Sequence, residues 1–171
     1  MKHLLKIGLA FLFLFPNLTI ANNDKRLIKV GYIDVQKTLK GYSEGKKAVD
    51  FLKSLKDNYE KKKLEMEEEI KKIEKDLEVK ARDLTEAQVR DYLTQIESKR
   101  QELEIFVRNA NTEKDKKERE MLTPIYEKIL TVVKEEAEKQ GFNFIIDSKY
   151  VLVADPELDI TDSIIKVLEG K

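Results

Sequence analysis

The chain of 171 residues contains no cysteine and no tryptophan, and its one histidine, His3, lies near the N-terminus. The residues after His3 therefore have none of the usual zinc ligands, no Cys–His or Ser–His–Asp nucleophile system, and no general base that titrates near neutrality. Without cysteine there are no disulfides, so packing or assembly must supply the stability of the fold. We expect no enzyme, and no catalytic residue, cofactor or metal site.

Glycine and proline are also scarce, with six and three residues. Between Lys46 and Gln140 there is no glycine and a single proline, Pro124. Charged residues make up 39% of the chain. Few helix breakers among many charged residues are typical of long helices rather than of a compact sheet domain.

A capping box divides this long segment. Thr85, followed three residues later by Gln88, predicts that one helix ends near Leu84 and that another begins at Glu86. Apolar residues recur at steps of three and four on both sides, as in helices that pack on each other. Folding the chain back there brings the two apolar stripes together, and the pairs that meet are Leu77 with Tyr92, Ile73 with Ile96, and Met66 with Leu103. Residues 43–140 are thus predicted to form an antiparallel helical arm with its tip near 83–86.

Two places in the returning helix depart from a regular stripe. Residues 111–120 have no apolar side chain and lie opposite residues 49–58, so Leu52 and Leu55 lack good partners across the arm. Pro124 removes a backbone donor and is expected to kink the helix. We expect the arm to flex at both places, because fewer contacts make local opening cheaper.

Short strand-like segments flank the arm. Residues 27–34, 142–147 and 151–154 are rich in β-branched and aromatic residues, and Thr161 can cap a short final helix that ends near Leu168. The fold class is therefore α+β, with residues 22–42 and 141–171 forming a small β body. Three short strands are too few for a self-sufficient sheet, so we expect their apolar residues to be buried between subunits.

The N-terminus has the pattern of a signal peptide. Lys2 and Lys6 precede an apolar core of nine residues, 7–15, which is too short for a permanent membrane span, and cleavage is predicted after Ala21. An uncleaved membrane anchor is the alternative. Removal of residues 1–21 leaves 150 residues with 31 basic and 33 acidic side chains, a formal charge of −2. This balance gives no argument for nucleic acid or for an anionic membrane surface.

Two motifs fail on closer inspection. Residues 41–47, GYSEGKK, have three residues between the glycines where a phosphate loop needs four, and Lys47 stands where Ser or Thr would bind magnesium. Asp155, Asp159 and Asp162 lack the alternating spacing and central glycine of a calcium loop, and turns and capping account for them.

Several segments together resemble the Skp/OmpH family of periplasmic chaperones. They are KVGYIDVQK at 29–37, PIYEKI at 124–129, GFNFIID at 141–147 and VLVADPELDIT at 151–161. The resemblance implies an ATP-independent holdase, a homotrimer whose body is an intersubunit β-barrel, and three arms around a cavity that holds unfolded outer-membrane proteins. It implies a soluble periplasmic location and no nucleic-acid partner. Familiar members are strongly basic and this chain is near neutral, so lipopolysaccharide or transient membrane contact is left open and no basic pocket is carried over.

Two sets of residues follow from this resemblance together with the stripes. Side chains with weak partners along the arm are candidates for the client surface, while the alternative is that they are buried within the arm. They are Leu52, Leu55, Tyr59, Met66, Leu103 and Phe106. The strand residues are candidates for the trimer interface, namely Val30, Tyr32, Ile33, Phe144, Ile145, Ile146, Val151 and Val153.

Two other classes of protein share the long helices. An exported coiled-coil protein that scaffolds or tethers the envelope would not need β segments on both sides of a mid-chain hairpin. A cytoplasmic prefoldin also places a helical hairpin on a β body, but a signal peptide argues against it. Suppression of the aggregation of a diluted outer-membrane protein would separate a holdase from a scaffold.

Overall fold

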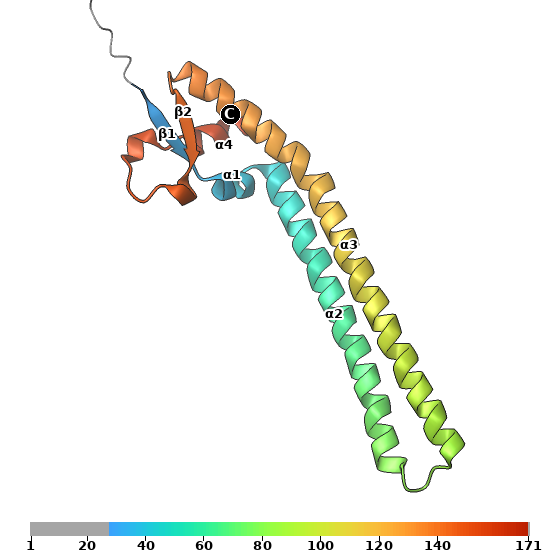
Figure 1. The fold of residues 1–171 in the computed structure, drawn as a ribbon. Helices are drawn as coiled ribbons and strands as arrows, with labels where there is room; N and C mark the ends of the chain where they lie inside the picture. Colours follow the sequence, from blue (N-terminus) through green and yellow to red (C-terminus); the bar gives the residue numbers. More distant parts are fainter. Residues whose placement is uncertain (1–27, 171) are drawn as a thin grey trace, which may run out of the picture.

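The computed structural model describes residues 28–170, which form a small body and one long arm (Figure 1). The predicted signal peptide and its cleavage after Ala21 lie outside these residues. In chain order the elements are β1 (Val30–Ile33), α1 (Val35–Gly41), α2 (Ser43–Lys80), α3 (Glu86–Lys139), β2 (Phe144–Asp147), the short 3-10 helices η1 (Ser148–Tyr150) and η2 (Pro156–Leu158), and α4 (Thr161–Leu168).

The arm consists of α2 and the first part of α3, which lie side by side in Figure 1. At its far end the Thr85 N–H donates to Gln88 Oε1 at 2.8 Å, and Thr85 Oγ1 accepts from Gln88 N at 3.4 Å, so the capping box is present. Along the arm Tyr92 Oη donates to Asp76 Oδ2 at 2.9 Å, close to the pairing expected from the two stripes. The 38 residues of α2 give a length of about 57 Å.

The seam between the two helices is thin. Ile70, Ile96 and Ala110 are buried there, whereas most other apolar side chains of the stripes are only partly covered. A pair of helices has no second layer to close over its seam, so residues that would be core in a bundle stay half exposed. The arm therefore presents apolar surface along its length without a single large patch.

Pro124 lies within α3, and the helix is continuous from Glu86 to Lys139 across it. Residues 111–120, which lack apolar side chains, are helical as well. The orange, C-terminal part of α3 inclines over the body in Figure 1, after a straighter course beside α2. Proline cannot donate to the carbonyl of Glu120, so α3 is missing one helical hydrogen bond where it approaches the body.

The body is built on two parallel strands whose connection is the whole arm. Val30 pairs with Phe144 and Ile33 with Asp147 at the two ends of the β1–β2 register. One face of this sheet covers a core to which α1, α3, α4 and the start of α2 contribute. The buried apolar residues of that core are Ile33, Leu39, Tyr42, Ala48, Ile125, Ile129, Phe142, Ile160, Ile164 and Leu168.

The expected strand at Val151–Ala154 does not form in the chain, and this prediction is wrong for the single subunit. Asp147 ends β2, and its Oδ1 accepts from Lys149 N at 3.1 Å, which turns the chain into η1. The segment after η1 pairs with neither β1 nor β2. Leu152 and Val153 are 100% and 93% exposed.

Candidate binding surfaces of the arm and the body

The six arm residues expected to contact a ligand chain are all partly buried. Leu52, Leu55, Tyr59, Met66, Leu103 and Phe106 belong to the seam between α2 and α3. The Tyr59 and Phe106 rings meet edge to face with centroids 6.1 Å apart and planes inclined by 78°. Burial raises the pKa of Tyr59, and a hydrogen bond with Glu113 raises it further. Tyr59 and Phe106 thus join the two helices, and all six side chains offer only part of their surface to a partner.

More exposed apolar side chains lie elsewhere on the arm. Leu64 on α2 and Ile105 on α3 are 51% and 54% exposed. Phe51, Val79 and Leu93 are exposed as well. Leu93 belongs to the apolar stripe of α3 and is nevertheless exposed, whereas the other four fall outside the stripes predicted from the sequence. Large apolar residues at off-stripe positions were the feature that could have identified them, since a helical pair has nothing there to bury them against.

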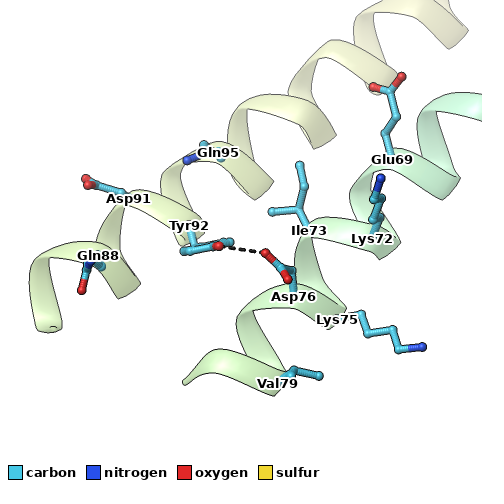
Figure 2. Close-up of a pocket in the computed structure, with 10 residues that line it drawn as sticks. All are labelled: Glu69, Lys72, Ile73, Lys75, Asp76, Val79, Gln88, Asp91, Tyr92 and Gln95. Carbon is cyan, nitrogen blue, oxygen red and sulfur yellow. Dashed lines mark hydrogen bonds between the residues drawn. The ribbon is translucent and has the colours of Figure 1, made fainter. Parts of the chain in front are cut away.

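An open groove of about 800 Å³ runs between the helices near the tip (Figure 2). Ile73, Val79 and Tyr92 give it apolar walls, and charged and amide side chains surround them. Tyr92 Oη donates to Asp76 across the groove, as the dashed line in Figure 2 marks. Hydrogen bonds from Lys80 and then Tyr92 lower the pKa of Asp76, so this carboxylate is ionised at neutral pH. The groove can form apolar contacts and hydrogen bonds with a chain laid along it.

The outer face of the two-stranded sheet is apolar. Alternation along the strands places Val30 and Tyr32 beside Phe144 and Ile146 on this face. Phe144 is 61% exposed, and Tyr150, Leu152 and Val153, in the segment that follows β2, are exposed as well. We call the residues Val30, Tyr32, Phe144, Ile146, Tyr150, Leu152 and Val153 the outer face.

The other candidate interface residues are placed differently. Ile33 is 4% exposed and packs in the chain's own core, where Ile145 also contacts it from β2. Val151 is partly buried. The expected set of eight therefore divides between the two sides of the sheet, and sequence alone did not separate them because both sides carry aliphatic residues.

Charges on the arm form many local ion pairs. Arg100 reaches Glu74 across the two helices at 2.6 Å, and Lys99 reaches Glu69 at 3.4 Å. Most other pairs join neighbours three or four residues apart on one helix, such as Lys80 with Asp76 at 2.8 Å. All are solvent exposed and add little to stability. Their effect is a mixed, nearly neutral surface around the exposed apolar side chains.

Residues 28–170 contain neither a candidate metal site nor a candidate membrane-spanning helix. No set of three or more acidic, histidine or cysteine side chains in this range is arranged to hold a metal ion. None of the helices in this range has the length and hydropathy required to span a membrane.

Comparison with known proteins places the fold. Residues 29–168 match the family model described as outer membrane protein (OmpH-like). The structure is similar to that of an OmpH-like protein from Caulobacter crescentus CB15, described as a candidate outer membrane chaperone, with a TM-score of 0.65 and 19% sequence identity over 84% of this chain and 85% of that chain. At this identity the likeness concerns the fold alone. Comparison with curated proteins gives no match.

Proposed function

The chain belongs to the OmpH-like outer membrane protein family, and from this membership together with the arm's surface we propose that it is an ATP-independent periplasmic holdase. In this proposal it binds unfolded outer-membrane proteins between its arms and prevents their aggregation. The observation that carries the proposal is the thin seam of the arm, where half-exposed apolar side chains are dispersed among mixed charges.

Such a surface suits an unfolded β-barrel protein. The strands of such a client alternate apolar and polar residues and aggregate when left free in water. Single apolar contacts spaced along an arm bind such a chain weakly at many points, and the combined effect is strong because each bound point raises the local concentration of the next. The client is then released by mass action when a competing partner binds it or when its concentration falls, and no nucleotide is needed.

We further propose that three chains assemble through their bodies. The outer face exposes Phe144, Ile146, Leu152 and Val153, which is a costly surface for a soluble monomer to leave in water. Apart from the single bridge between Tyr32 and Asp159, the outer edges of this two-stranded sheet have no further strand partner within residues 28–170. Pairing with a strand of another subunit would satisfy the backbone hydrogen-bonding groups of residues 151–154. Three arms would then project around one cavity.

The arm surface divides into two classes that an experiment can separate. Leu52 and Leu55 are partly buried in the seam, whereas Leu64 and Ile105 are exposed on the outer sides of their helices. If clients bind the exposed residues, changing Leu64 and Ile105 to Ser weakens holdase activity with little change in melting temperature. Changing Leu52 and Leu55 to Ser removes seam contacts, so the melting temperature is expected to fall before holdase activity does. Loss of a fully buried Leu costs on the order of 2–5 kcal/mol, and these partly buried residues contribute a share of that.

The measurement is light scattering of a diluted, unfolded outer-membrane protein together with the melting temperature of each variant. Thr94→Ala is the matched control, because Thr94 is exposed on α3 and its hydroxyl donates only within its own helix. Full holdase activity in a stably folded variant with both Leu64→Ser and Ile105→Ser would refute the assignment of client contacts to these two residues.

A further inference from the structure

The arm helix α2 begins at a joint that its own sequence does not cap. Tyr42 separates α1 from α2 with an extended backbone, φ −87° and ψ 125°, and its side chain makes no capping hydrogen bond. The cap comes from the other end of the chain. Ser43 N donates to Glu169 Oε1 at 2.6 Å, and Ser43 Oγ donates to Glu169 Oε2 at 2.9 Å. A carboxylate at a helix N-terminus also interacts favourably with the helix dipole.

The position of Glu169 is fixed because α4 is firmly seated in the body. Ile164 is fully buried, and Thr161 Oγ1 accepts from Asp34 N at 2.9 Å. Lys37 pairs with Asp162 at 2.7 Å. Near the joint α4 also packs closely against the end of α1, since a Cβ added to Gly41 would lie 2.7 Å from Ile165 Cδ1. Glu169 therefore transmits the position of the body to the first turn of α2.

The second helix of the arm, α3, lacks a helical hydrogen bond at Pro124, close to the joint at Tyr42. Ile125 and Ile129 enter the body's core, so the missing hydrogen bond at Pro124 lies where α3 passes from arm to body. Lys128 Nζ donates to Tyr42 Oη and lies 3.9 Å from Glu44, and it stands 4.9 Å from the centroid of the Tyr42 ring. The joint at Tyr42 and the missing hydrogen bond at Pro124 therefore both lie where the arm meets the body.

We propose that Glu169 is a positioning residue that fixes the direction in which the arm leaves the body. With Glu169 in place, the N-terminus of α2 is tied to α4 and the joint is held. Without it, α2 is free to swing about Tyr42 while α3 bends at Pro124. Given the proposed function, the C-terminal residues of the chain then set the width of the space between arms.

The test measures the arm directly and needs no client, so its outcome does not depend on holdase activity. The chain has no cysteine, and the changes Gln36→Cys on α1 and Ala87→Cys at the arm tip provide two label sites on exposed residues. Pulsed electron spin resonance, on labelled chains diluted with unlabelled ones, gives the distance distribution between body and tip. Hydrogen exchange of residues 44–47 reports on the cap.

Glu169→Ala is expected to widen the distance distribution and to speed exchange at 44–47 roughly fivefold, the loss typical of a removed helix cap. Ser43→Ala, which keeps the backbone donor, should produce a smaller change. Glu157→Gln changes an exposed glutamate of the body and should leave both readouts unchanged. If Glu169→Ala lowers the melting temperature, Glu169→Leu, which keeps much of the side-chain volume but has no acceptor oxygen, replaces it. An unchanged distance distribution in a folded variant of Glu169 would overturn the proposal.

Discussion

At the scale of single residues, the packing of the arm against the body requires a residue without a side chain at the start of α2. Gly45 is buried in the first turn of α2, where this helix lies directly against the backbone of α1. A Cβ added at this position would lie 2.2 Å from the Leu39 carbonyl oxygen, far inside normal contact. A backbone carbonyl cannot turn aside as a side chain can, so the two helices would have to separate.

Gly45→Ala is therefore expected to destabilise the protein, although alanine is a better helix former than glycine. Overpacking of this kind costs about 1–3 kcal/mol, which outweighs the gain in helix propensity of about 1 kcal/mol. Chemical unfolding followed by circular dichroism measures the difference. Ser54→Ala, at an exposed position on the same helix, is the control and should change stability by no more than about 0.5 kcal/mol. Equal stability of the Gly45 variant and the wild type would show that α1 and α2 are not packed this closely.

Residues that act locally were predictable, and residues that act over a distance were not. The capping box at Thr85 and Gln88 was evident from the sequence because both partners lie within one turn. The N-terminus of α2 at Ser43, by contrast, is capped by Glu169, which is 126 residues away. The chain has 33 acidic residues, and only the packing of α4 distinguishes this one.

At the scale of elements, the helices followed from periodicity and the strands only in part. Steps of three and four identify α2 and α3 because each helix needs an apolar face toward the other. The strand segments 30–33 and 144–147 also matched the sequence pattern. The segment 151–154 has the same composition but forms no strand in the chain, because β structure needs a neighbouring edge that composition does not supply.

Pro124→Ala is expected to stiffen α3 where it enters the body. Alanine restores the donor to the Glu120 carbonyl and is up to about 3 kcal/mol more favourable than proline inside a helix. Hydrogen exchange of residues 121–128 should slow, and the oligomeric state should be unchanged. Thr123→Ala, the exposed neighbour, is the control and should leave the exchange of this segment nearly unaltered. Identical exchange in Pro124→Ala and wild type would exclude the position as a point of flexion.

At the scale of the whole molecule, the arm and the body place different demands on the sequence. The arm exposes dispersed apolar side chains among ion pairs, while the body exposes the apolar side chains of the outer face on and after a sheet of only two strands. A surface of the first kind suits weak contacts with a changing partner. One of the second kind suits permanent association between copies of the chain.

We predict that the protein is an obligate trimer at micromolar concentration. Phe144→Ser combined with Ile146→Ser removes the centre of the outer face and should dissociate it, because these residues lie on the side of the sheet away from the chain's own core. Sedimentation velocity distinguishes the species. Val79→Ser, which changes an exposed residue on the arm, should leave the sedimentation coefficient unaltered. A folded wild-type monomer at micromolar concentration would contradict the assembly.

The most direct test of the holdase is the dilution of a urea-unfolded outer-membrane protein into nucleotide-free buffer, with aggregation followed by light scattering. We expect this protein to suppress scattering when enough assembled trimer is present to enclose every client molecule. A globular protein of equal mass and charge serves as the control and should have no effect. Equal scattering with this protein and with the control would contradict holdase activity.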